Sequence, residues 1–338
     1  MRLALLFGLA CGAEASSDYF EPFPTCADCL PTSIYEAPGI GFSLSLSTGT
    51  AAVHFYNNTV KNIASVPASS EYAALMKRLA VSPPPPPLSR WEKLQRSLNK
   101  NIGRPATPDV GIIATMLVSL RDATSIAVTS PLDRVAVSHP RIQGLAEADL
   151  WDALEYARLR PWVAVDLSRP KVVLPLPAAG GYPRQLLESY AVFAAHGEPR
   201  KGDRTFVDLE LGLATAEKKS NFWARVTERL QGFCGTVQEG FRLDTVLLTG
   251  ENATHPDFLR ALRTALLGSG YMQREGDGGK KVSFAHEMER SAAIDPIFAS
   301  ARGAAQYARW RQEAPIGCEE QDRCEEERRR EWNHVELR

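Results

Sequence analysis

Two segments in the second half of the chain constrain its fold more than any other feature. Thr245–Leu262 contains an apolar run, a threonine-glycine turn and, after a proline, an amphipathic pattern. This pattern predicts a strand that leads through a glycine turn into a helix. Asp295–Ala305 begins with Asp-Pro, as helices often do, and continues with small residues that allow backbone to pack against backbone. Such a helix suits the wall of a cleft.

The order and spacing of these segments resemble the actin-like ATPase superfamily, and within it the nucleotide-binding domain of the seventy-kilodalton heat-shock chaperones. In that family a strand ending in a glycine turn approaches the adenosine, and a DP…A.GAA helix closes the core nearby. Upstream, Gly39–Val53 resembles the first phosphate hairpin, Asp109–Thr124 a helix, Arg134–Pro140 a strand end and Asp152–Pro161 the next helix. The resemblance, over residues 38–310, implies a shortened two-lobed actin-like ATPase (ribonuclease H-like) α/β fold with reduced peripheral subdomains.

The same resemblance implies a domain organisation. The first lobe covers residues 39–165, with a proline-rich insertion at 83–87, and the second lobe covers residues 166–310. An extended lead-in with a C-x-x-C motif occupies residues 16–38, and a charged tail with two cysteines occupies residues 311–338.

The residues with which this family binds magnesium and positions water are largely replaced. Its first phosphate hairpin reads G-[IL]-D-[LF]-G-T, and the Asp orders the magnesium shell. Here Gly41 stands in place of that Asp and Ser43 in place of the second Gly. Arg169 stands where the chaperones have a Glu that helps to organise the catalytic water. The hydroxyls of Ser45, Ser47 and Thr48 bind phosphate only weakly without a cation nearby.

The second phosphate hairpin and the adenosine turn are altered as well. Asp208 is the single candidate catalytic residue, as a remnant of the family's D-[LFI]-G-G-G-T hairpin, and Gly212 is the glycine left beside it. The same segment matches a later strand turn of the family equally well. At the adenosine turn Gly250-Glu251 replaces two glycines and adds a carboxylate. The nucleotide-binding candidates by resemblance are Gly39, Gly41, Ser43, Ser45, Asp208, Gly212, Thr249, Gly250 and Glu251.

Ordinary structural roles are the alternative for each of these residues. Asp208 lies in a segment where an acid often caps a strand end or forms a salt bridge. Gly41 and Gly250 suit turns that require positive φ. Thr249 suits the cap of the helix that follows it.

The N-terminus predicts entry into the secretory pathway. Residues 1–15 combine a basic start, an apolar run too short to span a bilayer and an A-x-A cleavage site, as a signal peptide does. A buried first strand is the alternative. We expect no membrane span later in the chain. Two N-x-T sequons make Asn57 and Asn252 candidates for glycosylation, and a glycan on Asn252 would obstruct the adenosine turn.

The cysteines fit the same compartment. Cys26 and Cys29 lie near the start of the chain, and Cys318 and Cys324 lie near its end. In an actin-like fold the first strand and the last helix belong to one subdomain, so the resemblance implies that the two pairs meet. Four cysteines allow three connectivities, and the sequence does not choose among them. A zinc site is the alternative, but an oxidising lumen favours disulfides.

The charge balance and the altered motifs set the functional expectation. Lys and Arg number 39 and Asp and Glu number 40, so the net charge of −1 predicts binding to neither nucleic acid nor an anionic membrane. The sequence predicts a secreted, non-catalytic pseudo-ATPase that binds a protein partner and needs no cofactor, since a fold alone confers no activity. The first alternative is a residual ATP-binding protein or weak ATPase that uses Mg-ATP. The second is an unrelated secreted α/β hydrolase.

Overall fold

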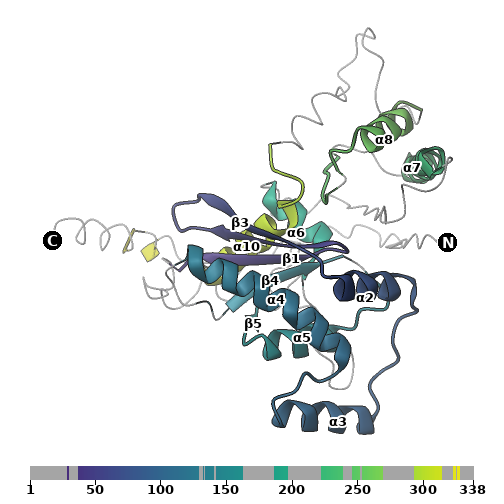
Figure 1. Ribbon diagram of the computed structural model, residues 1–338. Coiled ribbons are helices and arrows are strands. Elements are labelled where there is room, and N and C mark those ends of the chain that lie inside the picture. Colours follow the sequence, from purple (N-terminus) through teal and green to yellow (C-terminus); the bar gives the residue numbers. More distant parts are fainter. Residues whose placement is uncertain are drawn as a thin grey trace, which may run out of the picture.

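The chain folds as a mixed α/β protein around a six-stranded mixed sheet (Figure 1). This computed structural model describes residues 29, 37–128, 132, 134–140, 142–162, 186–196, 222–238, 246–251, 253–268, 293–313, 323–324 and 326–327. The predicted α/β class is confirmed.

The sheet combines an antiparallel and a parallel half. Its strands are β1 (Gly39–Leu44), β2 (Thr48–His54), β3 (Val60–Pro67), β4 (Arg134–His139), β5 (Arg160–Pro161) and β6 (Leu186–Leu187). The order is β3-β2-β1-β4-β5, with β6 also paired to β4. β1, β2 and β3 pair antiparallel, whereas β4 runs parallel to β1, β5 and β6. The hairpin predicted over Gly39–Val53 and the strand predicted near Arg134–Pro140 are therefore confirmed.

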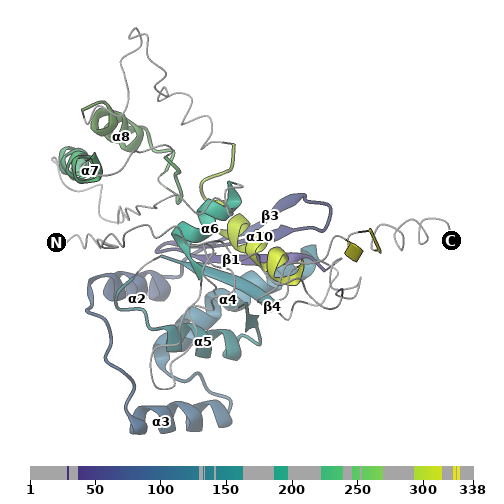
Figure 2. The same ribbon diagram turned by 180° about the vertical axis from the view of Figure 1, so that it is seen from behind.

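Eight helices are described around this sheet. They are α2 (Ser70–Val81), α3 (Arg90–Asn101), α4 (Pro108–Ala127), α5 (Glu147–Tyr156), α6 (Glu188–Ala195), α7 (Phe222–Gln238), α8 (Pro256–Gly268) and α10 (Ala299–Glu313). Figures 1 and 2 show α4 and α10 on opposite faces of the sheet. Because both faces are covered, every residue of β1 is buried.

Helix α4 provides the largest share of the main core. It begins with Thr107, whose side chain accepts a hydrogen bond from the amide of Val110, and it has a proline in its first turn. Its 20 residues, with a mean hydropathy of 1.4 over the most apolar window, are long and apolar enough to cross a membrane. It is the one such helix among the described residues, and length and composition alone do not make it a membrane span. Ile113, Leu117 and Leu120 lie buried in the core, which accounts for the composition.

Helix α10 packs directly against the backbone of β1. A Cβ atom added at Gly41 would lie 2.7 Å from the carbonyl carbon of Ala304 and closer still to backbone atoms of Ala301 and Ala305. Gly39 meets the same helix. The prediction that the small residues of this segment let backbone pack against backbone is confirmed. α10 also crosses the predicted domain boundary at residue 310, and it lies on the sheet of the predicted first lobe.

Helices α7 and α8 form a pair outside the sheet (Figure 1). The predicted amphipathic helix after Pro256 is confirmed as α8, whose Leu262 and Leu266 are buried against α7. The strand predicted before the glycine turn is not formed over residues 246–249. Val246 and Leu248 pack instead against the α7–α8 pair, and no described strand lies beside them to complete a ladder.

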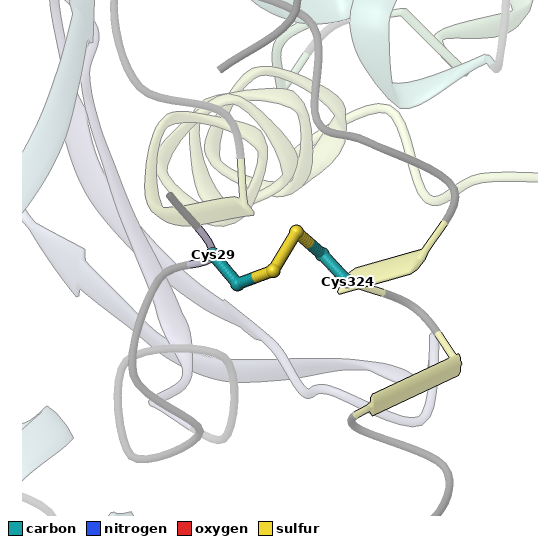
Figure 3. The surroundings of a disulfide bond; sticks show 2 residues. All are labelled: Cys29 and Cys324. Carbon is teal, nitrogen blue, oxygen red and sulfur yellow. A yellow bond between two sulfur atoms is a disulfide. The ribbon is translucent and has the colours of Figure 1, made fainter. Parts of the chain in front are cut away.

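The two ends of the described chain are tied to each other. Cys29 and Cys324, 295 positions apart, form a disulfide (Figure 3). The predicted link between the terminal cysteine pairs is thereby confirmed for these two residues, while Cys26 and Cys318 lie outside the described residues. The guanidinium of Arg309 in α10 donates a 2.7 Å hydrogen bond to the carbonyl of Ala37, which fixes the chain just before β1.

Candidate functional site

The candidate site lies at one edge of the sheet, where the parallel strands β1, β4 and β6 end. Their register places Ser43 beside Ser138 and His139 beside Leu187, so their carboxyl ends come together. Ligands of open α/β sheets bind outside this edge. The turn between β1 and β2, the start of α6 and residues 249–251 all reach it. We call these three segments the carboxyl-edge site.

The turn between β1 and β2 satisfies most of its own hydrogen bonds. Ser45 Oγ donates to the carbonyl of Thr48 at 2.9 Å and accepts from the Thr48 amide at 3.0 Å. The amide of Ser47 also donates to Ser45 Oγ, at 3.4 Å. Below the turn, the Tyr72 hydroxyl donates to the carbonyl of Ser45, and burial raises the Tyr72 pKa above its usual range. Together with the Ser45 amide, which donates to the carbonyl of Thr48 at 2.8 Å, three backbone amides and the hydroxyls of Ser45 and Thr48 form hydrogen bonds within the turn.

The glycine turn after residue 248 meets this hairpin across the edge. Ser47 Oγ donates a 2.8 Å hydrogen bond to Glu251 Oε2, although the two residues are 204 positions apart. Gly250 has φ +92°, a conformation that favours glycine, and its amide donates to the carbonyl of Pro296 at 2.9 Å. The interpretation of Gly250 as a turn glycine is confirmed.

Thr249 holds the start of α6 against the glycine turn. Its hydroxyl lies 3.1 Å from Glu188 Oε1 and 3.3 Å from the carbonyl of Pro296. The interpretation of Thr249 as a helix cap is wrong, because α8 begins only at Pro256 and His255 Nδ1 accepts from the amide of its second residue. Sequence analysis missed Glu188. Its position directly after a short apolar strand was the available indication.

The residues of β1 that were predicted to bind nucleotide lie inside the sheet. Gly39 and Gly41 contact α10, and Ser43 is buried between its neighbours Thr50 and Ser138. Gly41 does not have positive φ, so its interpretation as a turn glycine is wrong. Its small size is needed for helix packing instead. Of the remaining candidates, Ser45, Thr249, Gly250 and Glu251 reach the carboxyl-edge site. Asp208 and Gly212 lie outside the described residues, as does Arg169.

The polar residues beneath the site join α10 to the sheet. Ser138 Oγ lies 2.8 Å from Ser300 Oγ and 3.2 Å from the carbonyl of Phe42, and both serines are fully buried. The Thr50 hydroxyl faces the carbonyl of Ile297 at 3.5 Å. These contacts fix the start of α10 over the ends of β1 and β4. They are structural, because the hydroxyls involved have partners within the protein.

His139 ends β4 at the same edge. Its Nδ1 lies 2.9 Å from the carbonyl of Pro140, and its Nε2 lies 3.9 Å from Glu147 Oε1. Burial lowers the pKa of the imidazole, because the charged form loses its hydration. The neutral form of His139 is therefore favoured at neutral pH.

The charge of the carboxyl-edge site is set by two carboxylates, Glu188 and Glu251. A phosphate group placed here would meet negative charge unless a cation came with it. Among the described residues no cluster of three or more His, Cys, Asp or Glu side chains is arranged to hold a metal ion. The arrangement offers hydroxyls and carboxylates as hydrogen-bond partners for neutral or cationic groups.

One predicted glycosylation site is visible at the surface. Asn57 lies exposed in the turn between β2 and β3, where its Oδ1 accepts from the hydroxyl of Thr59 at 2.6 Å and from the Thr59 amide at 3.1 Å. The side chain is thus held in an Asx turn within its sequon. Asn252 lies outside the described residues.

Comparison with known proteins adds no family to this description. No protein-family model matches the chain, and no curated protein matches it. The geometry of the carboxyl-edge site is therefore the basis for a functional proposal.

Proposed function

We propose that this chain is a secreted, non-catalytic binding protein on an actin-like ATPase fold that has lost its nucleotide site. The order of the described elements supports the fold. Hairpin β1–β2, helix α4, strand β4, helix α5 and the small-residue helix α10 follow one another as the resemblance to the chaperone domain requires. The parallel strands then end at one edge, where the hairpin and the glycine turn meet.

The hydrogen bond from Ser47 to Glu251 carries the functional part of the proposal. In the related ATPases the first hairpin and the glycine turn flank a nucleotide. Here a carboxylate of the protein itself accepts the hydroxyl of the hairpin at 2.8 Å. A phosphate near this hydroxyl would face the like charge of Glu251, and like charges at close range are unfavourable. The Glu251 carboxylate thus makes phosphate binding at this edge of the sheet unfavourable.

The loss of the magnesium-ordering carboxylate is enforced by packing. An Asp at position 41 would need room for a Cβ and a carboxylate, yet the Cβ alone would overlap the backbone of α10. Restoring the acid would require α10 to move away from β1. The substitution and the position of α10 support the same conclusion, that this hairpin does not order a magnesium ion.

Two features support secretion. A disulfide joins Cys29 to Cys324, and disulfides persist mainly in oxidising compartments. Asn57 presents an exposed sequon. We propose that residues 1–15 are removed as a signal peptide and that the mature protein acts through a protein partner.

Thermal unfolding with millimolar Mg-ATP or Mg-ADP tests the loss of the nucleotide site. A ligand at a hundredfold excess over its dissociation constant stabilises a protein by about 2.7 kcal/mol, which a melting experiment resolves. We expect no shift for the wild-type protein and no phosphate release above background. Glu251→Gln removes the blocking charge, and Glu71→Gln, on the exposed surface of α2, is its matched control.

The outcomes separate the proposal from its main alternative. A nucleotide-induced shift that appears in Glu251→Gln and not in Glu71→Gln would show that the carboxylate blocks the site. A shift in the wild-type protein that disappears in Asp208→Ala would instead establish the residual ATP-binding protein. That alternative is favoured by one observation, the meeting of Ser45, Thr249, Gly250 and Glu251 at a single edge.

A further inference from the structure

Helix α3 is attached to the protein by its charged face. Arg96 forms ion pairs with Asp149 at 2.6 Å and with Asp152 at 2.8 Å, and Lys100 pairs with Asp152 at 3.0 Å and with Glu155 at 2.6 Å. Arg96 and Asp152 are buried, and Arg96 is the only buried residue of α3. The side of α3 that faces α5 is therefore ionic.

The opposite side of α3 is apolar and faces solvent. Trp91 is 70% exposed, Leu94 50%, Leu98 53% and Ile102 64%. Their spacing of three, four and four residues places them on one stripe along the helix and its C-cap. Most surface helices bury such a stripe, and single exposed apolar residues are common, whereas a contiguous exposed stripe indicates an interaction surface. We call these four side chains the α3 stripe.

Side-chain hydrogen bonds stabilise α3 near both of its ends. Ser89 and Glu92 form a capping box, in which the Ser89 amide donates to Glu92 Oε2 at 2.7 Å and the Glu92 amide donates to Ser89 Oγ. At the other end Asn99 Nδ2 donates to the carbonyl of Ala106 at 3.1 Å. The exposed prolines of residues 83–87 precede the helix. Both views show α3 far from the sheet, at one extremity of the molecule (Figures 1 and 2).

Apart from one acid, the charged side chains of α3 and of the turn after it that form no ion pair with a described residue are positive. Arg90, Lys93 and Arg104 form no ion pair with any described residue. The one acid of the helix, Glu92, is held in the capping box. Asp149, Asp152 and Glu155 of α5 are paired with Arg96 and Lys100. Although the net charge of the whole chain is −1, the exposed surface of α3 therefore carries apolar and cationic groups.

We propose that α3 binds the surface of an anionic membrane, with its apolar stripe in the headgroup boundary and its free cations at the lipid headgroups. A helix with Trp and Leu on one face and Lys and Arg on the other lies in the plane of the interface. The stripe stands on an outer ridge, so a flat surface reaches it without meeting the sheet. A second copy of the chain fits less well, because an antiparallel α3 pair would bring Arg90 of one copy near Arg104 of the other.

Sedimentation of the full, disulfide-bonded chain with lipid vesicles tests this proposal. We expect the protein to pellet with vesicles of phosphatidylcholine and phosphatidylserine, and much less with phosphatidylcholine alone. The double variant Leu94→Asp/Leu98→Asp should lose at least tenfold in partitioning. Ile126→Asp, which changes an 88% exposed apolar residue on α4, should bind as the wild type does. Arg90→Gln should lower partitioning roughly fivefold, whereas Lys93→Gln, on the side of the helix that faces α5, should lower it less.

A milder variant and a fluorescence measurement separate loss of membrane binding from loss of folding. Leu98→Gln serves as a milder variant if the double variant melts early, and Trp91 should be quenched by brominated lipids in the wild type, a signal that Trp91→Phe should reduce. Failure of the wild type to pellet with anionic vesicles overturns the proposal. Equal pelleting by the wild type and the stripe variants overturns it as well. A stripe that binds an acidic groove of another protein but no vesicle would also do so.

Discussion

The hydroxyl of Ser47 in the β1–β2 turn donates a 2.8 Å hydrogen bond to the carboxylate of Glu251, 204 positions away. This bond joins the two segments that would flank a nucleotide in an actin-like ATPase. The Ser47 hydroxyl is therefore already engaged as a donor, and the carboxylate of Glu251 places negative charge beside the hairpin. In the proposed pseudo-ATPase this carboxylate disfavours phosphate binding, and the packing of α10 on β1 excludes an acid at position 41.

The contact between α10 and β1 makes Gly41 sensitive to the smallest substitution. Gly41→Ala places a Cβ 2.7 Å from the carbonyl carbon of Ala304, in a region where neither backbone can yield easily. We expect a loss of about 3 kcal/mol in the free energy of unfolding, at the upper end of overpacking effects. Gly232→Ala in α7 is the control, because nothing lies within 4 Å of its Cβ position. It should stabilise the protein by about 0.5–1 kcal/mol.

Urea denaturation of both glycine variants measures these changes. An unfolding midpoint of Gly41→Ala equal to that of the wild type would mean that α10 does not pack on β1 in solution. Packing of α10 would then not explain why position 41 lacks an acid.

The buried acid between α3 and α5 should matter far more than a surface ion pair. The Asp152 side chain is 1% exposed and pairs with both Arg96 and Lys100. Asp152→Ala leaves Arg96 only one of its two carboxylate partners, and breaking a buried pair costs about 3–5 kcal/mol. Asp109→Ala removes the exposed pair with Arg78 and should cost less than about 1 kcal/mol. Equal losses by chemical denaturation would contradict the buried network.

The disulfide between Cys29 and Cys324 closes almost the whole chain into a loop. In the chain-entropy model such a loop stabilises the folded state by about 5 kcal/mol, less any strain. Cys29→Ser, Cys324→Ser and the double variant should therefore melt at the same lowered temperature, while Cys234→Ser should not reproduce this pattern. Non-reducing peptide mapping gives an independent check. Peptides that join Cys29 to Cys26 would show that the bond is local.

Sequence patterns predicted an element of this fold well where the pattern is typical of one kind of structure. The resemblance to the first phosphate hairpin predicted β1 and β2, and the small residues of Asp295–Ala305 predicted a helix that packs backbone on backbone. The terminal cysteines were matched only through the resemblance, since spacing alone does not reveal partners. Secondary structure within one short segment can be predicted from the sequence because it depends mainly on residues that are neighbours along the chain.

The carboxyl-edge site was predicted less completely, because its contacts join distant segments. Gly41 was interpreted as a turn residue, whereas its role depends on α10, about 260 positions later. The residues around Glu188 do not indicate that its carboxylate accepts a hydrogen bond from Thr249. The apolar spacing of α3 is visible in the sequence, but its outward orientation depends on Asp149 and Asp152 of another helix. Tertiary packing decides such features.

The turn between β2 and β3 should carry a glycan when the protein is made in a secretory cell. Asn57 is exposed, and its sequon partner Thr59 is hydrogen-bonded to it. Treatment with a glycosidase specific for N-linked glycans should lower the apparent mass of the wild type. Asn57→Gln should remove the glycan at this position, and Asn58→Gln, which keeps the N-x-T pattern, should retain it. A glycan map without Asn57 would remove this support for secretion.

His139 should make the folded state sensitive to mild acid. Burial lowers its pKa in the folded state below the ordinary value of about 6.5 that it has when unfolded. Between these two values the unfolded chain binds a proton that the folded chain does not, so the free energy of unfolding falls as pH drops below about 6.5. The slope approaches about 1.4 kcal/mol per pH unit and ends at the folded pKa. His139→Gln should flatten this part of the profile in urea titrations at stepped pH. Glu147→Gln, which changes the carboxylate 3.9 Å from Nε2, should keep it, because a neutral imidazole gains little from that charge. A slope that survives in His139→Gln would assign the effect to another group.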